Sequence, residues 1–252
     1  MKAKKTILTL VEILLIGVFL VSAYRIFHYY KEARENTALY GAMQEEKAEL
    51  EQQAEGQKEE KTLTPKEKYG AFKEKNEDFI GWLTIEGTKV DYPVVQSEEP
   101  NYYLYRDFNK QNSRYGTLYL GEGCDWEKSD NLLIHGHHMR NGSMFATVAK
   151  YASEKFYEEH KIIRFDTMKG FGTYEIIAVL KVGLAEEEHF AYYDFIKAKS
   201  KKEYDAFISA CKKRSLYDTG VSAKYGDRLI TLSTCEYSVD EGRIVVVAKK
   251  TK

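Results

Sequence analysis

The chain has few prolines, few cysteines and almost no net charge. Its 252 residues include 3 Pro and 3 Cys, and 38 Lys and Arg are balanced by 39 Asp and Glu, which leaves a net charge of -1. A charge so near zero argues against nucleic acid or any strongly charged partner. The length is enough for one domain of good size together with an additional segment.

The cysteines are an odd number, so on an exported domain at least one thiol is unpaired or pairs with another chain. Cys124 lies in a predicted loop, Cys211 on an apolar helix face, and Cys235 at the tip of a predicted strand. A disulfide between Cys124 and Cys211 stays open, because separation along the sequence gives no geometry. Under either alternative Cys235 keeps a free thiol.

The additional segment is N-terminal. Thr6 to Phe27 is almost continuously apolar and follows Lys2, Lys4 and Lys5. About 20 apolar residues are enough to cross a bilayer, and flanking basic residues stay in the cytoplasm. The sequence therefore predicts a cytoplasmic N-terminus at 1–5 and a single transmembrane anchor at 6–27, with the rest of the chain outside the cell.

A cleaved signal peptide is the alternative, since Val21-Ser22-Ala23 has the small residues of a cleavage site. The apolar run continues past that site, however, and its Tyr24, Phe27 and Tyr30 suit the interface between lipid and water. This continuation favours an uncleaved anchor.

Residues 28–63 are predicted to form an extracellular charged stalk. Lys31–Lys61 is dominated by Glu, Gln, Lys and Ala, with too few large apolar residues to bury a core of its own. Leu39, Met43 and Leu50 do not sustain the heptads of a coiled coil. The stretch is interpreted as a partly helical spacer, or as a linker with no role beyond its length, ahead of a domain at 64–252.

That domain contains short apolar runs separated by turn residues, a pattern that predicts a closed β-barrel with few helices. Eight strands are expected, at Phe79–Ile85, Val90–Val95, Gly116–Leu120, Asn131–His135, Lys161–Phe165, Thr173–Val182, Asp227–Thr234 and Arg243–Lys249. Helices are expected at Pro65–Lys75, Ser143–Tyr151 and Lys201–Arg214. The last has one apolar face, formed by Tyr204, Phe207, Ile208 and Cys211.

Two of these strands carry residues suited to nucleophilic chemistry. The segment T-L-S-T-C places Cys235 at the tip of one strand, and Arg243 opens the next. The polar stretch Glu236–Gly242 between them has the composition of a hairpin connection, so the thiol and the guanidinium are expected side by side. An adjacent cation favours the thiolate and can hold the negative charge that develops on an attacked carbonyl.

A third strand supplies imidazoles that could act as the base. It ends in His135-Gly136-His137-His138-Met139, and alternation puts His135 and His137 on one face and His138 on the other. The pattern alone does not choose between His135 and His137. Zinc ligation is another reading of clustered histidines, but Met139 and Arg140 occupy the Asp and His positions of the H-x-H-x-D-H pattern. No metal or other cofactor is therefore expected, and Glu186–Glu188 reads as a solvated acidic turn.

The segment G-H-H-M after an apolar strand, together with T-L-S-T-C before an R-x-V-V strand, resembles the sortases, the cysteine transpeptidases of Gram-positive cell surfaces, and more narrowly their class B. The resemblance covers Phe79 to the C-terminus. It implies an eight-stranded sortase-type barrel with a helix-bearing connection between the sixth and seventh strands. By position it makes His137, Cys235 and Arg243 the catalytic residues.

The resemblance also implies a reaction. A sortase cleaves the C-terminal sorting signal of a surface protein after Thr, forms a thioacyl intermediate, and transfers the protein to an amine of the peptidoglycan precursor or cross-bridge. His137 would protonate the leaving amine and Arg243 would stabilise the oxyanion, while Ser233 and Thr234 either line the substrate pocket or only pack within their strand. Glu236 stands where many members of the family have Asp.

Other interpretations remain open. Taken singly, Cys235 could be a small buried hydrophobic residue and Arg243 a charged guard of a strand edge. An exported cysteine hydrolase would use the same residues but release its product to water. A binding or assembly protein could keep the barrel without turnover. The combination of thiol, imidazole and guanidinium at three strand ends favours catalysis.

Overall fold

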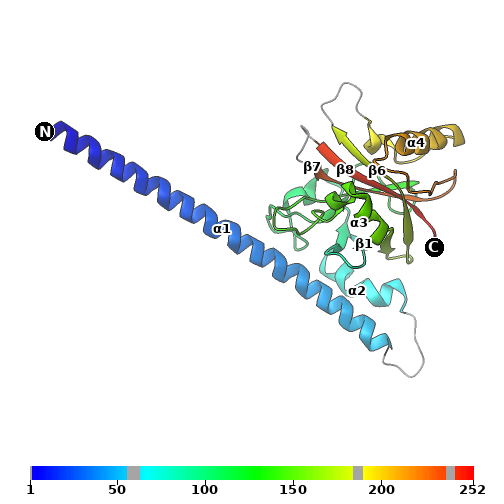
Figure 1. The fold of residues 1–252 in the computed structure, drawn as a ribbon. Coiled ribbons are helices and arrows are strands. Elements are labelled where there is room, and N and C mark those ends of the chain that lie inside the picture. Colours follow the sequence, from blue (N-terminus) through cyan, green and yellow to red (C-terminus); the bar gives the residue numbers. More distant parts are fainter. Residues whose placement is uncertain (1, 56–62, 184–189, 237–241) are drawn as a thin grey trace. The chain divides into compact units, whose positions relative to one another are not determined.

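The computed structural model describes residues 2–55, 63–183, 190–236 and 242–252 (Figure 1). The chain forms two compact units, residues 1–43 and 44–252, and the division falls within the long helix α1 (Lys2–Glu55). Within the first unit, large apolar side chains such as Ile13, Leu14 and Phe19 are exposed. In the described part of the chain, α1 is the one helix long and apolar enough to cross a membrane.

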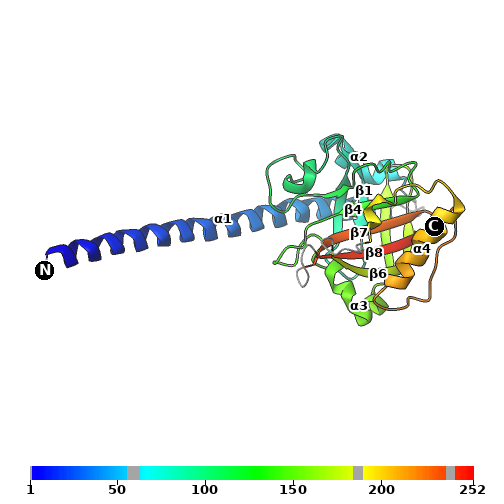
Figure 2. The same ribbon diagram turned by 90° about the horizontal axis from the view of Figure 1, so that it is seen from above.

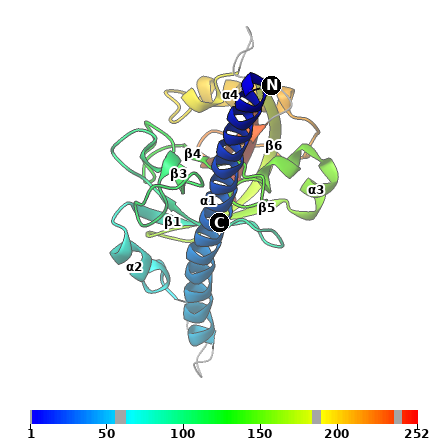
Figure 3. The ribbon, with the colours of Figure 1, turned by 90° about the vertical axis from the view of Figure 1, so that its left-hand side faces the viewer.

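The second unit is built on a closed barrel of eight strands, which confirms the predicted fold class. The order around the barrel is β1-β2-β3-β4-β7-β8-β6-β5. Figures 2 and 3 show the barrel from two other directions. The β2–β3 and β4–β7 pairs are parallel, and the other described pairs are antiparallel. The strands are β1 (Phe79–Thr84), β2 (Asp91–Val95), β3 (Leu118–Leu120), β4 (Asn131–His135), β5 (Ile162–Thr167), β6 (Thr173–Gly183), β7 (Leu229–Glu236) and β8 (Gly242–Lys250).

Short helical elements lie on the outside of this barrel. They are α2 (Pro65–Lys75), η1 (Tyr102–Tyr105), η2 (Val148–Ala152), α3 (Glu154–Glu159), η3 (Tyr192–Asp194) and α4 (Lys201–Arg214). η2 packs against β6, β7 and β8, and α4 packs against β6. Because these strands are covered on both faces, their sequences are continuous apolar runs, and Ile244–Ala248 of β8 is fully buried.

The two helices predicted at 65–75 and 201–214 are confirmed, and both begin with a side-chain cap. At the start of α2, the Glu67 amide donates to Thr64 Oγ1 and the Thr64 amide donates to the Glu67 carboxylate, which closes a capping box ahead of Pro65. At the start of α4, the Glu203 amide donates to Ser200 Oγ. The expected apolar face of α4 is buried, and along the chain the helix follows β6 and precedes β7.

The helix predicted at Ser143–Tyr151 is wrong. Met144 forms an isolated bridge with His138, residues 145–147 form a turn, and the short 3-10 helix η2 follows them. Met144 has a φ of 54°, which a right-handed helix does not allow, and its amide donates to the Tyr92 hydroxyl at 3.1 Å. A contact with a distant strand therefore overrides the local helix preference.

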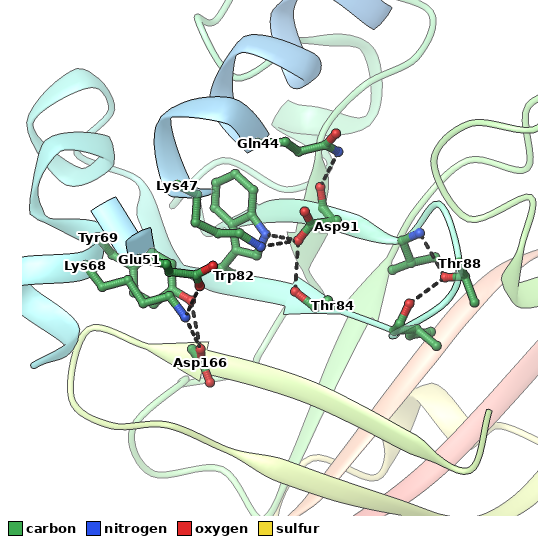
Figure 4. A network of polar contacts seen from close by, with 12 residues as sticks. Gln44, Lys47, Glu51, Lys68, Tyr69, Trp82, Thr84, Thr88, Asp91 and Asp166 are labelled. Carbon is green, nitrogen blue, oxygen red and sulfur yellow. Dashed lines mark hydrogen bonds and ion pairs between the residues drawn. The ribbon is translucent and has the colours of Figure 1, made fainter. Parts of the chain in front are cut away.

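The last turns of α1 belong to the barrel unit. We call Gln44–Glu55 the docked segment, because its polar side chains pair with the barrel in two networks (Figure 4). In the first network, Lys47 pairs with the carboxylate of Asp91 and lies 4.9 Å from the centre of the Trp82 ring. The same carboxylate accepts hydrogen bonds from Trp82 Nε1 at 2.6 Å and from Thr84 Oγ1 at 2.9 Å. Asp91 thus joins the docked segment to β1 and β2.

The second network joins the docked segment to α2 and β5. Lys68 of α2 lies between two carboxylates, 2.7 Å from Glu51 and 3.4 Å from Asp166. Asp166 also accepts a hydrogen bond from the Tyr69 hydroxyl at 2.7 Å, and burial raises the pKa of that hydroxyl well above its usual range. Only 16% of the Lys68 side chain and 14% of the Asp166 side chain are exposed. Pairs this sheltered are screened less than surface ion pairs.

Candidate active site

Two of the predicted site residues, Cys235 and Arg243, lie on neighbouring strands, and His137 follows the end of a third. β7 lies between β4 and β8 in the barrel (Figure 2). In the antiparallel pairing of β7 with β8, Cys235 is directly opposite Arg243, which confirms the expected juxtaposition of these two positions. In the parallel pairing of β4 with β7, His135 is opposite Ser233.

The chain continues beside β7 after β4 ends. The Gly136 amide donates to the Ser233 carbonyl at 3.2 Å, and Thr234 Oγ1 donates to the Gly136 carbonyl at 2.9 Å. The chain therefore still lies beside β7 at Gly136, one residue before His137. Glycine is needed at 136, because a Cβ there would lie 2.5 Å from the Leu118 side chain.

The His137 ring is held by the short helix η1. Its Nε2 lies 2.7 Å from the Leu104 carbonyl oxygen, and its ring centre lies 5.8 Å from that of the exposed Tyr105. A carbonyl oxygen can only accept a hydrogen bond, so Nε2 carries the hydrogen. In the neutral ring, Nδ1 is therefore the nitrogen that can take up a proton.

The Leu104 carbonyl depends in turn on a tight approach of two chain segments. Gly116 has a φ of +59°, and a Cβ there would lie 2.6 Å from the Tyr103 carbonyl and 2.7 Å from the Leu104 carbonyl. The neighbouring Thr117 amide donates to the Tyr103 carbonyl. A side chain at 116 would therefore displace the carbonyl that orients His137. Sequence reasoning missed Leu104, because a backbone carbonyl leaves no mark in the residue types.

A cavity of about 520 Å³ opens beside these strand ends. Arg243 and His135 both line it, and the Arg243 guanidinium donates to the Gly242 carbonyl at 3.0 Å. The cavity is lined by Asn101, Leu104, Tyr119, Glu122, Leu133, His135, Tyr192, Tyr193, Asp194 and Arg243. Aromatic walls and a few polar groups are typical of a site for a peptide or a small molecule.

His135 lies in a different environment from His137. Burial and the nearby charge of Arg243 lower the pKa of His135 from 6.5 to about 4. Its ring packs on that of Tyr119, with 5.3 Å between their centres, and Tyr119 donates to the side-chain oxygen of Asn101 at 3.1 Å. His135 is therefore neutral near pH 7.

Ser233 and Thr234 are both 2% exposed. The Ser233 hydroxyl lies 2.7 Å from the hydroxyl of Tyr192, which lines the cavity, while Thr234 bonds to the Gly136 carbonyl. Ser233 thus contacts Tyr192 of the cavity wall but does not itself line the cavity. Thr234 joins β7 by a hydrogen bond to the segment that carries His137.

The other two cysteines are free, so the disulfide between Cys124 and Cys211 does not form. Burial raises the pKa of Cys124, and it raises that of Cys211 to about 12. Neither thiol can be a thiolate at neutral pH. Within the described ranges, no group of three or more His, Cys, Asp or Glu could hold a metal ion, and Glu186–Glu188 lies outside those ranges.

Comparison with known proteins gives one family throughout. The family model described as Sortase domain matches residues 83–251. Sortase B of Staphylococcus aureus is 31% identical over 251 residues, which is 98% of each chain, and sortase B of Listeria monocytogenes is 31% identical over 177 residues, which is 69% of this chain and 70% of the relative. A solved Staphylococcus aureus sortase B–substrate complex superposes with a TM-score of 0.77 at 28% identity, covering 88% of this chain and 98% of that one.

Proposed function

Because the chain belongs to the sortase family of cysteine transpeptidases, in its class B, we propose that it cleaves the C-terminal sorting signal of surface proteins after Thr and transfers them to an amine of the cell wall. The observation that carries this proposal is the register of β4, β7 and β8. It sets Cys235 opposite Arg243 and lets the chain beyond His135 run beside the end of β7.

Cys235 is the nucleophile in this proposal. The other two cysteines are buried and have raised pKa values, so they cannot supply a thiolate. The sulfur of Cys235 attacks the carbonyl carbon after Thr and forms a tetrahedral intermediate. When the carbon–nitrogen bond breaks, the downstream peptide leaves as an amine and the upstream part stays on sulfur as a thioester.

His137 moves the protons of both half-reactions. Because the Nε2 hydrogen is bonded to the Leu104 carbonyl, the proton passes through Nδ1, which takes it from the Cys235 thiol and gives it to the nitrogen of the leaving peptide. The same nitrogen then takes a proton from the incoming amine as it attacks the thioester. That proton returns to the sulfur as the thioester breaks, and through the whole cycle Nε2 keeps its hydrogen on the Leu104 carbonyl while only Nδ1 gains and loses a proton.

Arg243 supports the oxyanion. It lies opposite Cys235 and lines the cavity, so its guanidinium is suited to hold the oxygen that becomes negative in the tetrahedral intermediate. Ser233, through Tyr192, and Thr234, through Gly136, are proposed to shape the substrate pocket indirectly. No cofactor takes part in this scheme.

The proposed location follows from α1. Its apolar N-terminal part, residues 6–27, is proposed as a single-pass anchor with residues 1–5 in the cytoplasm and the catalytic unit outside the cell. The sorting-signal proteins and the peptidoglycan amine would then meet the enzyme on the outer side of the membrane.

Product analysis tests the transfer step. Full-length protein in detergent is incubated with a fluorogenic pentapeptide library that has an invariant Thr, with and without triglycine as the added amine. Ligated product that appears only with triglycine supports a transpeptidase, and hydrolysis that ignores triglycine favours the cysteine hydrolase. A protein that cleaves no library member contradicts the proposed function.

A further inference from the structure

His135 stands apart from its neighbours because its ring nitrogens are unused by the protein. His137 and His160 each place a ring nitrogen on a backbone carbonyl, at 2.7 Å and 3.1 Å. Among the residues that the structure describes, His135 has a ring contact with Tyr119 but no hydrogen-bond partner for either nitrogen. A polar group set into a protein wall is costly unless something bonds to it.

A ligand in the cavity would meet the ring of His135, which lines it. His135 forms part of the cavity wall together with Arg243. Position 121 has no side chain to crowd the ring, whereas a Cβ there would lie 3.1 Å from His135 Nε2 and 3.1 Å from the Leu133 side chain. Neither the aromatic contact with Tyr119 nor the packing of β4 needs the polar nitrogens, since a phenyl ring would serve both.

The charges around the cavity limit which ligand group can bond there. Arg243 repels a cationic group, and a carboxylate would pair with Arg243 and neutralise the charge proposed for the oxyanion. The acidic side chains of the cavity are Glu122 and Asp194, and the charge that acts on the pKa of His135 is that of Arg243. A neutral imidazole presents one donor and one acceptor.

We propose that His135 is a specificity-determining residue that binds the sorting peptide directly, through an uncharged group that both donates and accepts hydrogen bonds, such as a hydroxyl or a carboxamide. This inference rests on the proposed function, because it assigns a contact to that same substrate. His135 takes no part in proton transfer. Its effect is on substrate binding, whereas that of His137 is on turnover.

The test replaces the imidazole with rings and amides of known chemistry in the full-length protein. His135→Phe keeps the packing on Tyr119 and removes both nitrogens, while His135→Gln restores an uncharged donor and acceptor. His160→Phe is the matched control, because it removes an imidazole that packs on Phe156 outside the cavity. The probe is the library peptide that the wild-type enzyme cleaves best, together with versions in which each hydroxyl or carboxamide side chain is exchanged for an apolar isostere.

His135→Phe is expected to raise KM about tenfold and to leave kcat within about twofold, the loss of one substrate hydrogen bond. It should also lose the preference of the wild-type enzyme for one of the polar side chains over its isostere. His135→Gln should recover most of the affinity, and His160→Phe should match the wild type.

A His135→Phe variant with wild-type KM and unchanged side-chain preference overturns the inference and leaves the proposed function standing. A fall in kcat alone also overturns it, because that result makes His135 part of the proton transfer. Wild-type protein that cleaves nothing in the library overturns the proposed function, and the inference with it.

Discussion

The docked segment and the site at the ends of β4, β7 and β8, which we call the strand-end site and which includes His135, Cys235 and Arg243, use polar residues in opposite ways. Around the docked segment, the carboxylates are bonded by other groups of the protein: Asp91 alone receives Lys47, Trp82 and Thr84 (Figure 4). At the strand-end site, the ring nitrogens of His135 bond to no described residue. Polar groups that are bonded within the protein favour one rigid arrangement, and polar groups without a partner are available to a substrate. The first region is therefore expected to control stability and the second to control activity.

The largest expected effect on activity is at Cys235 of the strand-end site. Cys235→Ala should reduce cleavage of sorting peptides to the background rate with an unchanged thermal midpoint, because it removes the proposed nucleophile. Cys211→Ala is the matched control. It should keep full activity and lose about 1 kcal/mol of stability, since it removes a buried sulfur from α4. Activity that survives in Cys235→Ala would break the assignment.

Arg243→Lys should lower kcat about 100-fold, or roughly 3 kcal/mol in activation free energy, with the thermal midpoint unchanged. The substitution keeps the positive charge but replaces a planar set of donors with a single ammonium. If Arg243 only guards a strand edge, Lys serves equally well, and steady-state kinetics will show near wild-type kcat.

Asp91→Asn, which changes the partner of the docked segment on β2, should lower stability rather than activity. It leaves Lys47, whose side chain is 10% exposed, without a counter-charge, and should cost about 3 kcal/mol of stability with kcat unchanged. Glu86→Gln is the control, because its pair with Arg164 is exposed and should contribute less than about 1 kcal/mol. Thermal unfolding in detergent measures both. A loss of kcat with intact stability would mean that the two regions are coupled.

At His135 we expect a smaller effect, on the way folding stability depends on pH. Its folded-state pKa is lowered from 6.5 to about 4, so the unfolded chain binds the proton first as the solution is acidified. The stability that this group contributes is complete above about pH 6.5 and is lost as the pH falls toward 4. Between pH 7 and 4.5, the wild type should lose about 2 kcal/mol more than His135→Gln in urea unfolding. Equal losses would contradict the neutral state assigned to the ring.

The sequence predicted the barrel, α2 and α4 because each rests on local signals. The apolar face formed by Tyr204, Phe207, Ile208 and Cys211 indicates α4, and the short apolar runs separated by turn residues indicate the strands. It also placed Cys235 and Arg243 opposite each other, since a hairpin fixes that pairing.

The features it did not predict depend on contacts between distant segments. Met144 leaves the helical region because its amide bonds to Tyr92, and His137 is oriented by a backbone carbonyl. The docked segment has few apolar residues and is held by ion pairs, so its composition is that of a solvated stalk. Charge pairing with Asp91 and Asp166 has no periodicity that a sequence pattern can detect.

The central claim is that the ends of β4, β7 and β8 form a covalent catalytic centre, and trapping the acyl-enzyme tests it most directly. Full-length protein is mixed with a cleavable sorting peptide in the absence of an amine, quenched in acid, and mapped by tandem mass spectrometry. We predict a mass increase equal to the upstream peptide acyl group on Cys235, absent from Cys235→Ala and depleted when triglycine is added before the quench. An acyl group on another residue, or cleavage without any enzyme-bound acyl group, would contradict the account.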